Sequence, residues 1–119
     1  MSADAITNTI ANNKARMEKL ENQKEQYDTA ISAAKEQKHS IWVQMRSFLN
    51  RCGTSNVSHL TFAQKAEYLR LRGMRDAAQD AYRYNQSRYL SVNGSLFDLV
   101  LDTGKLEMSQ MVLGNVASA

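Results

Sequence analysis

Apolar side chains recur along the first two-fifths of the chain at alternating steps of four and three residues. The series runs from Ile6 to Phe48, with polar residues at Asn13, Lys24 and Lys38. This spacing keeps the apolar side chains on one side of a helix and allows two helices to wrap around each other. It predicts a helix over about residues 3–51. The members of the series are Ile6, Ile10, Asn13, Met17, Leu20, Lys24, Tyr27, Ile31, Ala34, Lys38, Ile41, Met45 and Phe48.

The segment "CGTSNVSH" interrupts this pattern and predicts a loop over residues 52–61. Gly53 suits the left-handed backbone conformation that commonly ends a helix. Thr61, followed three residues later by Gln64, has the pattern of a helix N-cap with its reciprocal partner. A second helix is therefore predicted over about residues 62–91.

The last quarter of the chain allows two interpretations. Asn93-Gly94 is a common turn dipeptide and predicts an end to the second helix. Beyond it, residues 95–116 are predicted as a third helix, although a β-hairpin turning at residues 102–105 also fits. We favour the helix because leucine and methionine are good helix formers and an isolated hairpin is marginally stable. The helical alternative places Phe97, Leu101, Gly104, Met108 and Met111 on one stripe.

The composition supports helices throughout. The chain has 119 residues, no proline and five glycines, whereas loops are commonly rich in both residues. We predict an all-α, elongated, single helical domain spanning residues 1–119. Its long N-terminal helix forms an antiparallel helical hairpin or coiled coil with one or two further helices.

A thin hairpin of this kind leaves apolar side chains in water, and helical chains often cover such surface with another chain. We therefore expect a homo-oligomer or a helical protein partner. The residues predicted to form the partner-binding helix seam are Met17, Leu20, Tyr27, Ile31, Ile41, Trp42, Met45, Phe48, Leu71, Met74, Tyr82 and Tyr89.

The positive charge is concentrated in the middle of the chain. The net charge is +3, but residues 38–90 hold nine basic and three acidic side chains, a local charge of +6. On a helix the arginines of this region flank the tyrosine-containing stripe on both edges, which favours covering of a buried seam. The alternative is a basic surface that binds nucleic acid or an acidic protein. The possible anion-binding residues are Arg70, Arg72, Arg83 and Arg88.

Candidate catalytic chemistry is sparse. Cys52 is the only cysteine, and His39 and His59 are the only histidines. No spacing among them matches a nucleophilic or metal-binding motif, and "DTGK" lacks the other residues of a phosphate-binding loop. The sequence therefore predicts a protein that is not an enzyme, with no catalytic residues, metal ligands or cofactor.

The functional prediction is a helical coiled-coil protein that acts through protein–protein interaction or self-assembly. A subunit or chaperone of a secretion apparatus, or a virion component, would fit. The N-terminal segment lacks the features of a cleaved signal peptide, and no stretch is apolar enough to cross a bilayer. We expect the protein in the cytoplasm, in a virion, or exported without a cleaved signal.

Overall fold

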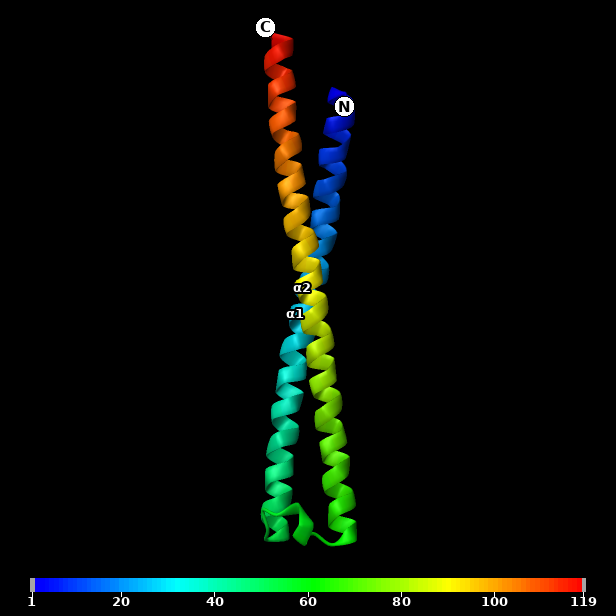
Figure 1. Cartoon of the computed structure of the whole chain (residues 1–119), viewed down its shortest axis with the longest axis vertical. Coiled ribbons are helices and arrows are strands. Elements are labelled where there is room, and N and C mark those ends of the chain that lie inside the picture. The colour runs from blue at the N-terminus through cyan, green and yellow to red at the C-terminus, as the bar shows by residue number, and fades with distance from the viewer. Residues whose placement is uncertain (1, 119) are drawn as a thin grey trace. The chain divides into compact units, whose positions relative to one another are not determined.

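The structure, a computed structural model, describes residues 2–118 and the side chains of residues 2–114. It contains two long helices, α1 (Ala3–Cys52) and α2 (Phe62–Ser118), connected through a short 3-10 helix, η1 (Val57–His59) (Figure 1). No strand occurs over the described residues. The predicted all-α helical hairpin is confirmed.

Local capping explains both ends of α1. The Ala5 amide donates to the Ser2 hydroxyl at 3.1 Å at the start of the helix. At its end, Gly53 adopts φ +72° and its amide donates to the Asn50 carbonyl at 3.1 Å. The Thr54 amide donates to the Leu49 carbonyl at 3.3 Å. This is the pair of hydrogen bonds by which a left-handed glycine ends a helix, as the sequence predicts.

The start of α2 also follows the sequence prediction. The Gln64 amide donates to the Thr61 hydroxyl at 3.2 Å, and the Thr61 amide donates to the Gln64 side-chain oxygen at 3.0 Å. Each residue therefore satisfies a backbone donor of the other. Between the helices, Asn56 caps η1 by accepting a hydrogen bond from the Ser58 amide at 3.0 Å.

The predicted helix end near residue 91 is wrong. Helix α2 continues without interruption from Phe62 to Ser118, through Asn93-Gly94 and through residues 102–105. A glycine in a helix costs about 1 kcal/mol relative to alanine. The inward-facing positions continue in register across this point, with Tyr89, Val92 and Leu96 all half-buried. Their packing offsets the cost of the glycine, so a turn dipeptide lies inside a helix.

The chain divides into two compact units, and each contains a stretch of α1 antiparallel to a stretch of α2 (Figure 1). We call residues 28–87 the turn unit. We call the segments 2–27 and 88–118 together the terminal unit. In the turn unit, a small core is surrounded by partly buried aromatic rings. The buried core residues are Ile41, Met45, Leu71 and Ala78, with Phe48 and Tyr68 packed against them.

In the terminal unit, polar side chains help to set the pairing of the helices. The Asn13 amide group donates to the Thr103 hydroxyl at 3.2 Å, and Thr103 is buried. The Gln110 amide group donates to the Thr7 hydroxyl at 2.9 Å. The residue with the lower number on α1 pairs with the residue with the higher number on α2, as expected for antiparallel helices. Asn13, a polar position in the predicted seam, therefore has a specific partner across the unit.

Candidate protein-binding surface

The predicted helix seam lies mainly between the two helices of the chain itself. Of the twelve predicted partner-binding residues, only Trp42 and Met74 are exposed, with 46% and 40% of their surface accessible. A second protein would therefore need a different surface from the one that the first helix's repeat indicates. Ile41, Met45 and Leu71 are buried, and Met17, Leu20, Tyr27, Ile31, Phe48, Tyr82 and Tyr89 are half-buried.

A second apolar stripe runs along α2 within the terminal unit, and it is exposed. Its positions also alternate by four and three residues, which makes it a heptad repeat. At 100° per residue, it lies roughly 140° around the helix from the side that faces α1. We call it the outer stripe, and its members are Leu90, Gly94, Phe97, Leu101, Gly104, Met108 and Met111.

The large side chains of the outer stripe are accessible to solvent. Leu90 is 62% exposed, Phe97 66%, Leu101 59%, Met108 60% and Met111 63%. Exposed apolar surface that is contiguous in this way typically marks an interaction site. Val100 and Val112, both more than half exposed, widen the stripe.

The exposed side of α1 in the same unit has a different character. Among residues 2–27, the exposed side chains are polar, charged or alanine. The outer stripe is therefore a property of α2 alone. A partner would make its apolar contacts with one helix, in the manner of a helix added to a bundle.

Comparisons with known proteins give no match. No protein-family model, curated protein or solved structure matches the chain. No helix over residues 2–118 combines the length and the apolar character that crossing a membrane requires. Any interpretation of function therefore rests on the surface features of the chain itself, chiefly the outer stripe.

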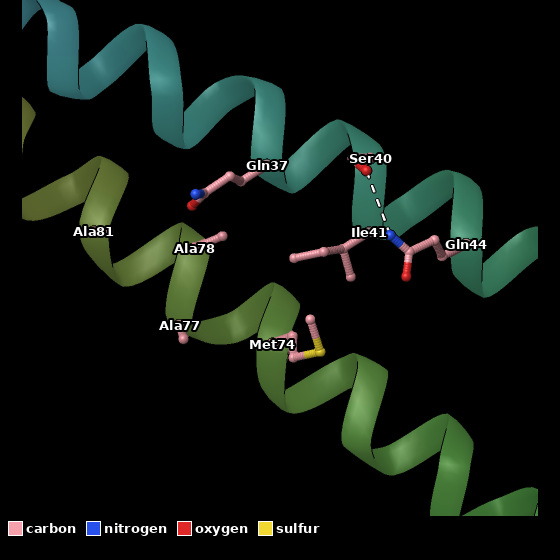
Figure 2. Close-up of a pocket in the computed structure, with 8 residues that line it drawn as sticks. All are labelled: Gln37, Ser40, Ile41, Gln44, Met74, Ala77, Ala78 and Ala81. Atoms are coloured by element: carbon pink, nitrogen blue, oxygen red, sulfur yellow. Dashed lines mark hydrogen bonds between the residues drawn. The ribbon is translucent and has the colours of Figure 1, made fainter.

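A groove in the turn unit is a weaker candidate for protein binding (Figure 2). Ile41 extends from α1 toward Ala78 of α2, and Met74 lies near one end of the groove. Apart from Ile41, the α1 side chains that line the groove are polar, and the Gln44 amide group donates to the Ser40 hydroxyl at 3.4 Å. Small alanine side chains and a polar wall provide less apolar surface to bury than the outer stripe provides.

The turn unit also contains a basic and aromatic cluster, which we call the basic cluster. The Lys35 and Lys38 ammonium groups lie 5.8 and 6.0 Å from the centre of the Tyr82 ring. The His39 ring stacks on the exposed Trp42 ring at 6.0 Å. The Arg46 guanidinium lies 4.9 Å from the centre of the Trp42 ring. These contacts lie within cation–π and stacking range.

The basic cluster differs from the four arginines that the sequence indicates. Arg70 binds the Glu67 carboxylate through two hydrogen bonds of 2.7 and 3.0 Å. The hydrogen bond raises the pKa of Arg70 and lowers the pKa of Glu67. Arg72, Arg83 and Arg88 are exposed. Sequence reasoning missed the contacts of Lys35 and Lys38 with Tyr82 because only the pairing of α1 with α2 brings them together. The contacts of His39 and Arg46 with Trp42 follow helical spacings of three and four residues, which were a signal in the sequence.

Cys52 and His59, the residues considered for catalysis, lie in different elements of the structure. Cys52 is half-buried in the last turn of α1, and His59 is exposed in η1. Over the described residues, no group of three histidine, cysteine or carboxylate side chains is arranged to hold a metal ion.

Proposed function

We propose that this protein acts by binding protein helices through the outer stripe of α2. The supporting observation is the exposure of a heptad repeat that the hairpin itself leaves uncovered. Burial of a Leu, Phe or Met side chain contributes roughly 1.5–3 kcal/mol, so covering several stripe residues favours association. The protein is a non-enzymatic interaction or assembly component, and a secretion apparatus or a virion remains a fitting setting.

Affinity capture from the native source, compared between variants, tests this proposal. Tagged wild-type protein should retain a helical partner or further copies of itself in a defined ratio. Leu101→Glu should lose at least nine-tenths of that captured material, because the substitution places a charge in the apolar contact. The Asn12→Glu variant, altered on the exposed polar side of α1, should capture as much as wild type.

Quantitative mass spectrometry of the captured material provides the readout. Circular dichroism should show equal helix content in all three proteins, since positions 12 and 101 are exposed and glutamate is a good helix former. Identical capture by wild type and Leu101→Glu would contradict the proposal.

A second candidate function rests on the basic cluster. Lys35, Lys38 and Arg46 lie around Tyr82 and the exposed Trp42, and the 38–90 region has a charge of +6. Cationic groups beside exposed aromatic rings are the ordinary means of binding single-stranded nucleic acid. We propose this as the alternative function of the turn unit.

Fluorescence anisotropy with a single-stranded oligonucleotide separates the two functions. Under the alternative, Lys35→Gln/Lys38→Gln should weaken binding at least tenfold and make the affinity less dependent on salt. Lys14→Gln/Lys19→Gln, which removes the same charge from the terminal unit, should have little effect. Equal losses in both double variants would show non-specific attraction and reject the alternative.

A further inference from the structure

We infer that the partner of the outer stripe is the outer stripe of a second copy of this chain, aligned antiparallel. This inference rests on the proposed function and specifies which protein binds the outer stripe. The two-fold axis passes between residues 102 and 103 of each copy. Two features of the terminal unit support this alignment: the fit of its glycines to large apolar side chains, and the positions of its charges.

Neither the packing nor the backbone conformation of the described chain requires the two glycines of the outer stripe. Gly94 and Gly104 lie in the interior of α2, where glycine is less favourable than alanine. A Cβ atom built at either position meets nothing within 4 Å. Neither residue needs left-handed backbone, since Gly53 is the only described residue with positive φ. A Cβ atom at Gly73 would also meet nothing within 4 Å. Open space alone therefore does not indicate a binding surface, and the residues that would lie opposite each glycine in a second copy must be considered.

The sizes of the stripe residues are complementary in the antiparallel alignment. With the axis between 102 and 103, Leu101 lies level with Gly104 of the second copy, and Gly94 lies level with Met111 of the second copy. Phe97 lies level with Met108. Each glycine therefore receives a large side chain, in the manner of a knob entering a hole.

The charges beside the stripe are complementary in the same alignment. Asp98 and Lys105 each follow a stripe position directly, so they border the same edge of the stripe. A two-fold axis perpendicular to the helices brings this edge against its own copy. Asp98 then lies about 3 Å along the axis from the level of Lys105 of the second copy, at 1.5 Å per residue. Among the described residues, neither side chain forms an ion pair within the chain.

Sliding one copy by a heptad removes the charge complementarity in either direction. One direction places Gly94 level with Gly104 of the second copy, leaving a void, and brings Asp98 beside Asp98 of the second copy. The other direction brings Lys105 beside Lys105 of the second copy. A parallel alignment places each glycine level with itself and gives Lys105 no carboxylate partner. Voids and like-charge contacts both oppose association.

Sedimentation equilibrium of the purified chain tests whether a second copy binds the outer stripe. Wild type at micromolar concentration should have twice the 13.4 kDa mass of the chain, and Leu101→Glu should have the mass of one chain. Leu69→Glu, at another exposed leucine of α2 in the turn unit, should retain the doubled mass. A wild-type chain that stays monomeric overturns the inference.

Cross-linking tests the alignment. In a Cys52→Ser background, an Asp98→Cys chain and a Lys105→Cys chain should be joined by a short bismaleimide only when mixed. Asp98→Cys alone should not cross-link, because the two cysteines would lie about 14 Å apart along the axis. Efficient cross-linking of Asp98→Cys alone, or a mixture without the product that joins Asp98→Cys to Lys105→Cys, overturns the alignment.

Exchanging the charges at positions 98 and 105 gives a second test of the alignment. Asp98→Lys and Lys105→Asp should each weaken self-association about tenfold, since each makes two cross-copy pairs repulsive. A mixture of the two variants should recover the wild-type affinity, because both pairs are then attractive. Failure of the mixture to recover would overturn the pairing of these residues.

These experiments separate the inference from the proposed function. If the purified chain is monomeric while capture from the native source still depends on Leu101, the occupant is a different protein and the proposed function stands. If the capture is also independent of Leu101, both fail.

Discussion

Leu71→Ala is expected to destabilise the protein by about 3 kcal/mol, within the usual range for a buried leucine. Leu71 is 4% exposed and belongs to the core of the turn unit with Ile41, Met45 and Ala78. Removing its branched end takes packing from both helices, because the core has few other residues to compensate. Urea unfolding followed by circular dichroism, at one fixed protein concentration, measures the change.

Leu69→Ala provides the matched control. Leu69 lies two residues away on the same helix, but half of its surface is exposed. The same chemical change there should cost less than about 1 kcal/mol, because little apolar surface leaves a packed environment. Equal losses at the two positions would contradict the inward orientation of Leu71.

Gly94→Pro is expected to cost about 3 kcal/mol or more and to reduce the helix content of the terminal unit. Residue 94 lies inside α2, where proline removes a helical hydrogen bond and its ring collides with the carbonyl of residue 90. The measurement is best made in the Leu101→Glu background, so that self-association does not contribute. An unchanged free energy of unfolding would contradict a helix that continues through residue 94.

Gly94→Ala in the same background distinguishes the two structures by the sign of its effect. In a helix with open space around the Cβ position, alanine should stabilise the protein by about 0.5–1 kcal/mol. If residue 94 had the left-handed backbone of a turn, alanine would instead destabilise it.

Local chemistry in the sequence predicts much of this fold. The seam from Ile6 to Phe48 indicates α1, and the ends of the loop follow from Gly53 and the Thr61–Gln64 pair. Each of these signals depends on residues within a few positions of one another. Hydrogen bonds and backbone conformation over such short distances are controlled by the local residues themselves.

The same local reasoning fails at Asn93-Gly94. Placing the glycine of a turn dipeptide inside a helix costs about 1 kcal/mol relative to alanine. The packing of the neighbouring half-buried residues Tyr89, Val92 and Leu96 outweighs this cost. Their packing depends on a helix that is distant in the sequence, so a local pattern cannot weigh it. The stripe from Phe97 to Met111 is recognisable in the sequence, but whether it faces inward or outward is not.

The sequence by itself determined that the chain is helical, where α1 begins and ends, and where α2 begins. Only the tertiary structure decided that α2 is continuous, that the first apolar repeat is covered by the chain's own second helix, and that the outer stripe is left exposed. A repeat records which residues share a side of a helix, whereas burial depends on which other helix lies against that side. The basic cluster follows the same rule, because Lys35 and Tyr82 come together only through the antiparallel pairing of α1 and α2.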